Sequence, residues 1–505
     1  MTLPLLFNGM RLSAINQPSL FSEMNPDNDK VLVLIQLNGG NDGLNTLVPL
    51  DQYDTLVNLR SNVILPESSL LTVTDKIAFH PNMGSMKSLY EDGKLGMVQS
   101  VGYPNQNRSH FRSMDIWQSG SPADQSWTTG WLGRYFENDH PAFPEGYPND
   151  TYADPFAITL GSVVSETCQG VGANFSMTLN DPFSLSPLAE SGGTANTDTP
   201  YGKELDFLKT TIAQSNQYAA NITTAAEKGN NMVEYPQSSL AEQLKNIALL
   251  VSGGLKTKVY IASIGGFDTH ANQVEDGDTT VGDHASLLLN LSESMAAFQA
   301  DLQALGIEER VLGITFSEFG RQIRSNFSLG TDHGTAAPLF IFGSCANSTI
   351  LGDNPEITPD VQVQEGVPMQ YDFRDVYGSV LQDWFELSES SIQSLLHADY
   401  QRLPIIQNCS LATSTDDPIL EEVQLTAFPN PLRGQTTIQF SSRGGHIRLS
   451  IFNAMGSELE VLINKTLPKG DHQINWSAQR WPAGNYYYRL QEGPSQRTKR
   501  LILVN

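Results

Sequence analysis

Few cysteines and no long apolar run are the first limits that this 505-residue sequence sets. Cys168, Cys345 and Cys409 are too few and too far apart for a disulfide-rich framework or a zinc ribbon, although one bridge, for instance to Cys409, is possible. No stretch reaches the ~18–20 consecutive apolar residues that a membrane-spanning helix needs, which predicts a soluble mature chain.

Basic residues are also scarce. The sequence holds 30 Lys and Arg against 55 Asp and Glu, a formal net charge of −25. A surface of this sign repels phosphate backbones, which argues against nucleic-acid binding. The shortage is uneven: residues 424–505 hold 10 basic and 4 acidic residues, a balance of +6, so the rest holds 20 and 51, or −31. The change of sign indicates two units with separate roles.

The ends of the large unit are marked by composition. The first residues, MTLPLLFNGMRLSAI, are similar to the rear half of an export signal without its basic start. The alternative is an N-terminal extension that packs on the surface. We therefore divide the chain into this signal remnant or extension (1–27), a large unit (28–410), a polar linker (411–423) and a C-terminal unit (424–505).

Short apolar strands alternate with helices in the large unit. Strands that are apolar on both faces are typical of a doubly wound α/β fold, in which helices cover a mostly parallel sheet. The region Pro141–Asn231 is rich in Gly, Ser, Thr, Asn and Pro, and it predicts insertions and long loops with one helix near Lys203–Gln217. Further predicted helices are the one that starts at Met86 and ends at Gly93-Lys94, Ser239–Ser252 and Ala285–Leu305. The predicted strands are Val31–Leu37, Leu95–Gly102, Val259–Gly266, Val311–Phe316 and Pro338–Gly343.

Residue types that ligate metals gather at the ends of these strands. One group, with His333, comes just before a predicted strand. The other three come just after a predicted strand: Asn41-Asp42 between glycines, Asp268 with His270, and Ser317-Glu318 with Arg321. Carboxylates and imidazoles at one sheet edge are what a divalent cation site needs, and glycine lets the backbone come close to an ion. Taken singly, they are also explained as turn residues, polar loops, a helix-start acid and a surface base.

Five segments in order resemble one known family. They are LIQLNGGNDGLNTLVP, FHPNMGSMKSLYEDGKLGMVQSVGYPNQNRSHFRSMDIWQSG, IGGFDTHANQ, ITFSEFGRQIRSN and GTDHGTAAPLFIFG. They resemble the bacterial domain of unknown function 1501, a sulfatase-like family of the alkaline-phosphatase superfamily, from about Val31 to Cys409. The resemblance implies a sheet of alkaline-phosphatase type and a metal cluster, usually of two ions, which polarises a phosphate or sulfate ester and activates a Ser or Thr.

The resemblance also implies the metal ligands. Asp42 matches the metal-binding Asp of the first strand, and Ser317-Glu318 stand where the family pattern has Asp-His, which puts a second metal site in doubt. His284 is a further candidate, or else a surface residue at a helix start. The expected cofactor is one or two divalent ions, zinc first and manganese, calcium or magnesium as alternatives. The predicted ligands are Asp42, Asp268, His270, His284, Glu318 and His333.

The nucleophile that the resemblance implies lies at a helix N-terminus after the first strand, and Ser109 is the best match. A helix N-terminus offers N–H donors to an oxyanion, although Ser109 could equally be only the N-cap of that helix. His110 and Arg321 are the other predicted catalytic residues. No C/S-x-P-x-R segment follows Asp42, so a formylglycine sulfatase is not expected.

Residues 424–505 consist of short strands between Gly, Asn and Pro turns. The segments AFPNPLRGQTTIQF, IRLSIFNAMG and WPAGNYYYRL resemble the type A sorting domain of the type IX secretion system. The alternative is a carbohydrate-binding or spacer β-sandwich. The resemblance implies signal-peptide export to the periplasm, then passage through the type IX secretion machinery to the outer-membrane surface or the exterior.

The sequence thus predicts a secreted or cell-surface, metal-dependent hydrolase of phosphate or sulfate esters. Its substrate would be a small-molecule or glycan ester. The alternative is a degenerate, non-catalytic binding or surface protein on the same scaffold, because a fold does not fix a function.

Overall fold

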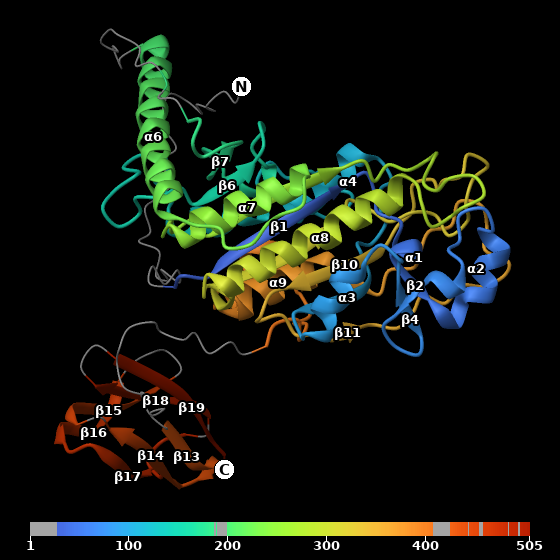
Figure 1. Ribbon diagram of the computed structural model, residues 1–505. Helices are drawn as coiled ribbons and strands as arrows, with labels where there is room; N and C mark the ends of the chain where they lie inside the picture. Colours follow the sequence, from blue (N-terminus) through green and yellow to red (C-terminus); the bar gives the residue numbers. More distant parts are fainter. Residues whose placement is uncertain are drawn as a thin grey trace. The chain divides into compact units, whose positions relative to one another are not determined.

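The structure is a computed structural model (Figure 1) that describes residues 28–185, 188, 199–407, 425–442, 444–453, 458–482, 484–492 and 495–504. The chain divides into two compact units, 1–412 and 413–505, which are treated separately below. The signal remnant and linker predicted from the sequence lie outside the described residues, as does Cys409.

A nine-stranded sheet forms the centre of the large unit (Figure 1). Most neighbouring strands run parallel, and this confirms the predicted mostly parallel α/β fold. A short strand, β12 (Tyr371–Asp372), also pairs with β5. The order along the sheet is β11 (Ile350–Leu351), β5 (Leu95–Gly102), β10 (Ala337–Phe342), β9 (Val311–Phe316), β1 (Val31–Asn38), β8 (Val259–Gly265), β6 (Ala157–Leu160) and β7 (Ser176–Leu179).

Helices cover both faces of this sheet, and alternate residues of β1 show the two layers. Leu32 and Leu34 pack in one apolar core, whereas Val33 and Ile35 pack in the other. Each large apolar side chain buried in this way contributes about 1.5–3 kcal/mol. The first core includes residues of α4 (His110–Ser119), α5 (Trp131–Asp139), α9 (Phe373–Asp383) and α10 (Glu389–Leu396); the second includes residues of α3 (Gly84–Glu91), α6 (Pro200–Lys228), α7 (Ser239–Ser252) and α8 (Asp283–Ala304).

Smaller elements connect these layers. A three-stranded sheet and two short helices lie between β1 and α3 in the sequence: α1 (Gly43–Thr46), β2 (Leu47–Pro49), α2 (Tyr53–Leu59), β3 (Leu71–Thr72) and β4 (Ile77–Phe79). Four single turns of 3₁₀-helix occur at Leu50–Gln52, Glu67–Ser69, Glu166–Cys168 and Glu308–Arg310.

The direction of β10 decides which loops meet. β1, β8 and β9 run parallel and therefore end at one edge of the sheet. β10 is antiparallel to both β9 and β5, so β5 also ends at that edge and β10 begins there. The segment before β10, which includes His333, consequently lies at the same edge as the segments that follow the other four strands.

The structure corrects part of the sequence analysis. The region Pro141–Asn231 contributes two strands to the sheet, β6 and β7, which the sequence analysis assigned to loops because they are short and lie among polar residues. The helix predicted near Lys203–Gln217 is the longer α6. Cys345 forms a disulfide, and among the described cysteines Cys168 is a free, buried thiol.

None of the described helices is both long and apolar enough to cross a membrane. The seven strands of the C-terminal unit form one mostly antiparallel sheet with one apolar core, in which Trp476 and Tyr488 are buried. Two antiparallel parts of this sheet are joined by the parallel pairing of Leu432 with Leu503. Their strands are β13 (Leu425–Arg433), β14 (Gln435–Ser442) and β17 (Gly470–Ser477) in one, and β16 (Glu458–Leu467), β15 (Gly445–Asn453), β18 (Gly484–Glu492) and β19 (Ser495–Leu503) in the other.

Candidate metal centre

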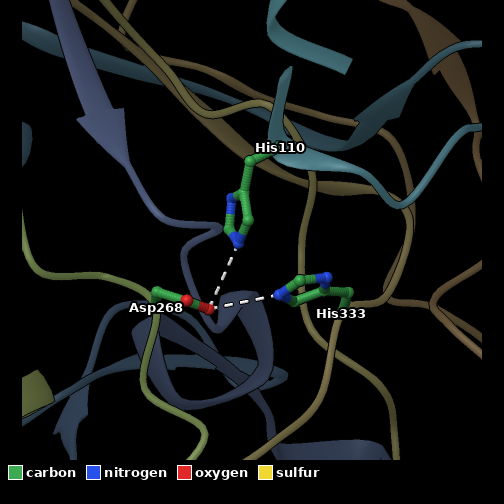
Figure 2. A group of neighbouring side chains, drawn as sticks. All are labelled: His110, Asp268 and His333. Carbon is green, nitrogen blue, oxygen red and sulfur yellow. Dashed lines mark hydrogen bonds and ion pairs between the residues drawn. The ribbon is translucent and has the colours of Figure 1, made fainter. Parts of the chain in front are cut away.

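Three metal-ligand side chains converge at the shared edge of the sheet (Figure 2). The rings of His110 and His333 both point at the carboxylate of Asp268. Asp268 Oδ1 lies 3.4 Å from His110 Nε2 and 3.2 Å from His333 Nε2. All three ligand atoms lie within 4.8 Å of one another, close enough to bind a single ion.

Each of these side chains comes from a different strand end. His110 is the first residue of α4, which follows β5; Asp268 follows β8; and His333 precedes β10. Of the residues predicted to gather at the sheet edge, Asp268 and His333 lie together in the structure. His110, which the sequence analysis assigned a catalytic role, is the third member of the group.

Hydrogen bonds fix the orientation of both imidazoles. His110 Nδ1 lies 2.7 Å from Glu318 Oε1, and His333 Nδ1 lies 2.8 Å from the carbonyl oxygen of Arg108. A carboxylate and a carbonyl only accept, so each Nδ1 carries a proton and Nε2 is the nitrogen left to bind an ion when the ring is neutral. Metal-bound histidines in proteins are held in this way by carboxylates and carbonyls, and Glu318 contacts His110 from the side away from the group of three.

The chemistry of the three residues fits a divalent cation. The two Nε2 atoms face a carboxylate oxygen that also accepts from Arg321, and two imidazole nitrogens with one carboxylate oxygen can bind a single cation together. Among the described residues, His110 Nε2 is buried and has no hydrogen-bond partner. Burial also lowers the pKa of His333 below its usual value, although its hydrogen bonds to Arg108 and Asp268 oppose this shift. Two nitrogens and one oxygen are a typical donor set of a zinc site that keeps a position open.

His270 lies next to this group. Its Nδ1 is 2.9 Å from Asp268 Oδ1, and its Nε2 is 3.9 Å from Asp332 Oδ1. His270 and Asp268 are both partly exposed, whereas Glu318 behind them is buried. This predicted ligand therefore lies beside the group of three rather than in it.

The structure does not bring Asp42 into the group. Asp42 is buried and forms an ion pair with the equally buried Arg60, whose Nη1 is 3.2 Å from Oδ1. Gln273 Nε2 donates to the other carboxylate oxygen at 2.5 Å. Burial, the largest single influence, would raise the pKa of Asp42, but the charges of Arg60 and His284 and the hydrogen bonds from Arg60 and Gln273 together hold this pKa below its usual value. Protein groups therefore already satisfy this carboxylate.

His284 is neither a surface residue nor close to Asp268. It is buried in the first turn of α8, and its Nε2 lies 3.0 Å from Asn41 Oδ1. Burial lowers its pKa to about 4, although Asp42 opposes this shift, so its imidazole is neutral near pH 7. The interpretation of His284 as a surface residue is therefore wrong, because its ring packs against His80 and Phe267.

Arg321 is buried, so its interpretation as a surface base is also wrong. Its guanidinium donates to four carbonyl oxygens and to Asp268 Oδ1 at 2.7 Å; the carbonyls belong to Gly39, Gly40, Phe267 and Thr331. No helix occurs between residues 317 and 336, all of which the structure describes, so Glu318 is not a helix-start acid. Arg321 thus joins the loops after β1 and β8 to the segment before β10.

The glycines after β1 serve this close packing of loops. Gly39 has a φ of +123°, and a Cβ atom there would lie 2.2 Å from the backbone nitrogen of Asp268. Glycine is therefore required where the two loops cross. The sequence analysis expected these glycines to admit an ion; the structure shows that they admit the neighbouring loop.

Ser109 occupies the N-cap position of α4, but its side chain makes no capping hydrogen bond. Its neighbours Arg108 and His110 both contact the site, through the carbonyl that binds His333 and through the imidazole. Ser109 itself is exposed. Ser109 thus has an exposed side chain without a capping bond, on a segment whose two neighbouring residues contact the site.

Three residues of this region were missed by the sequence analysis: Arg60, Arg108 and Gln273. Arg108 and Gln273 lie inside the quoted motifs, and a general search for polar side chains in those motifs could have found them. Arg60 lies 18 positions after Asp42, and no spacing pattern connects the two.

Solved structures from three bacteria are similar to the chain at low identity. PorZ, a surface component of the type IX secretion system of Porphyromonas gingivalis, is 17% identical. The match covers 16% of this chain and 11% of PorZ, with a TM-score of 0.13. A protein of the alkaline phosphatase superfamily from Vibrio parahaemolyticus is 10% identical. The match covers 97% of this chain and 87% of that protein, with a TM-score of 0.31. A sulfatase from a Pseudoalteromonas species is 10% identical, with 89% and 84% covered and a TM-score of 0.32. Similarity at this level carries no conclusion about activity.

Two family models match the chain, and no curated protein does. Residues 29–396 match a protein family of unknown function, DUF1501, and residues 426–504 match a secretion system C-terminal sorting domain. The sorting domain marks the chain for the type IX secretion system, and so for the cell surface or the exterior. Because the DUF1501 family model matches well over half of the sequence, the chain belongs to the DUF1501 family, and it carries a secretion sorting domain at residues 426–504.

Proposed function

We propose that the large unit is a metal-dependent hydrolase of phosphate or sulfate esters, which acts after secretion. The observation that supports this proposal is the convergence of His110, Asp268 and His333, with both imidazoles oriented by hydrogen bonds on their far side. Three protein ligands leave a position open on a tetrahedral ion, as in catalytic rather than structural zinc sites.

The three residues would hold one divalent ion, zinc first and manganese, calcium or magnesium as alternatives. Such an ion supplies Lewis acidity, which polarises the ester and lowers the pKa of a nearby hydroxyl. Asp42 and His284 are not assigned to it, because each is satisfied by its own protein partner.

The chain supplies the remaining groups. Ser109 gives its hydroxyl proton to water and attacks the phosphorus or sulfur atom through its oxygen, and the bond to the alcohol oxygen breaks; water then releases phosphate or sulfate and returns a proton to the serine oxygen. The first backbone N–H groups of α4 stabilise the negative charge of the ester oxygens. His270, which is partly exposed and lies beside Asp268, protonates the departing alcohol. Arg321 positions the loops and does not contact the substrate.

Metal content and turnover on the same sample test this function. Purified full-length chain should bind zinc tightly and hydrolyse an aryl phosphate or an aryl sulfate, whereas His333→Ala should lose both properties. Its fold should persist, because His333 is partly exposed. The matched control is His397→Ala, at the C-cap of α10, which should keep zinc and turnover.

The same experiment also tests the alternative function, a non-catalytic binding protein on this scaffold. The pairing of Asp42 with Arg60, in place of an ion, is the observation that supports it. A wild-type chain that binds no divalent ion and hydrolyses neither ester would decide for this alternative.

Exposed rings beside the site favour an ester whose alcohol carries a ring. Phe111 follows His110 and is 92% exposed, and Phe327 is fully exposed. Phe327 follows Asn326, whose Nδ2 donates to the carbonyl of His270 at 2.8 Å. Flat apolar rings in water at the rim of a polar site are suited to stacking on an aryl group or on the face of a sugar.

Phe111→Ala should therefore raise KM for phenyl phosphate or phenyl sulfate about 2- to 10-fold, because a ring contact contributes about 0.5–1.5 kcal/mol. Its kcat should change little, and the methyl ester should be unaffected. The control is Phe183→Ala, which removes an exposed phenylalanine that follows β7. Equal KM values for wild type and Phe111→Ala would exclude the ring contact.

A further inference from the structure

Gln273 is a fully buried glutamine that joins Asp42 to the two segments carrying Asp268 and His333. Its Nε2 donates to Asp42 Oδ2 at 2.5 Å. Its Oε1 accepts from Thr331 Oγ1 at 2.6 Å and from Thr269 Oγ1 at 3.2 Å. One amide thus connects the strand end of β1 to both loops.

The partners leave this amide one orientation. The carboxylate of Asp42 only accepts, so it must face the NH₂ group, and the carbonyl oxygen is left for the two hydroxyl donors. Asp42 is itself fixed by its ion pair with Arg60. Because all of these groups are buried, a change of orientation would leave polar atoms without partners, at a high cost in free energy.

The two threonines lie next to the metal-ligand residues. Thr269 stands between Asp268 and His270, and Thr331 precedes Asp332 and His333. Thr331 N also donates to Thr269 O at 3.1 Å, so the two segments are bonded side by side. The hydroxyl groups of both threonines therefore point at the same glutamine from adjacent segments.

We propose that Gln273 is a positioning residue for the metal centre. It holds the Asp268 and His333 segments at the separation that one ion requires, with the Asp42–Arg60 pair as its fixed anchor. This inference rests on the proposed function for its link to metal, but the positioning itself is a property of the metal-free chain. It also gives the carboxylate at the end of β1 a role: Asp42 orients Gln273 instead of binding the ion.

The test replaces Gln273 by methionine, which has a similar volume and makes no such hydrogen bonds. In full-length Gln273→Met, zinc affinity, measured by competition with a chromogenic chelator, should fall about 10- to 100-fold, as for other residues that orient metal ligands. Gln299→Met is the control, since Gln299 is equally buried in α8 but bonds to Glu308. It should keep wild-type affinity.

A second measurement does not depend on the metal. Hydrogen–deuterium exchange of the zinc-free chain should speed up in peptides spanning 266–274 and 329–336 in Gln273→Met, and not in Gln299→Met. Unchanged exchange in these peptides would overturn the positioning role, whatever zinc does. Faster exchange in a chain whose wild type binds no zinc would support the positioning and refute the metal-dependent function.

A milder variant covers the case in which Gln273→Met does not fold. Thr331→Val removes one hydroxyl bond to Gln273 and keeps the shape of the side chain. It should speed up exchange in the same two peptides and weaken zinc binding by a smaller factor. Exchange identical to wild type in Thr331→Val would also contradict the role assigned to Gln273.

Discussion

Ser109→Ala should abolish ester turnover while the chain keeps its zinc. Removing a nucleophile lowers kcat by roughly 10⁴-fold or more in hydrolases that form a covalent intermediate. The stability should be unchanged, because the Ser109 side chain makes no capping hydrogen bond that could be lost. Turnover of an aryl phosphate and an aryl sulfate, zinc content and the melting temperature of one preparation give the result.

A serine that does cap a helix is the matched control. Ser238 is the N-cap of α7, and its Oγ accepts from the backbone nitrogen of Ala241 at 3.1 Å. Ser238→Ala should lose about 1 kcal/mol of stability and keep full turnover. If Ser109→Ala turned over at the wild-type rate, Ser109 would not be the nucleophile.

Asp42→Asn should destabilise the large unit strongly, by about 3–5 kcal/mol. The variant leaves the guanidinium of Arg60 buried without a counter-charge, and breaking one side of a buried ion pair has a cost of this size. Scanning calorimetry of the large unit's transition measures the loss. The double variant Asp42→Asn with Arg60→Met should recover much of it, because the unpaired charge is then gone.

An exposed ion pair gives the scale for comparison. Lys87 and Glu91 in α3 are 3.0 Å apart and largely exposed, so Glu91→Gln should cost less than about 1 kcal/mol. If Asp42 were instead a metal ligand, Asp42→Asn would lower zinc content at little cost to the zinc-free chain. That outcome would reverse the assignment made from the structure.

The Asp42–Arg60 pair also predicts how stability depends on pH. The pKa of Asp42 is lower in the folded chain than its usual 3.8. An acid of this kind contributes its stabilisation fully above the unfolded pKa and loses it as the pH falls through the folded value. The difference in stability between wild type and Asp42→Asn should therefore be constant near neutral pH and shrink below about pH 4.

The sequence by itself determined the layered fold and the edge at which function would lie. The apolar pattern predicted β9 and α7 with the bounds that the structure shows. Such elements can be predicted because the spacing of apolar residues within the segment indicates its type. The motifs after β1, β8 and β9 carried the polar residues that the edge requires. A strand of four residues such as β6 is too short for such a pattern, and it forms through pairing with β8, a contact far away in the sequence.

Only the tertiary structure decided which polar residues meet. The antiparallel direction of β10 placed His333 beside Asp268, and the path of the chain after β5 placed His110 there as well. The partner of a buried carboxylate depends on which cation the fold brings within reach, and for Asp42 the fold brings Arg60. Residue types can therefore be predicted from local sequence, whereas the choice between an ion and a guanidinium follows from long-range packing that satisfies each buried charge.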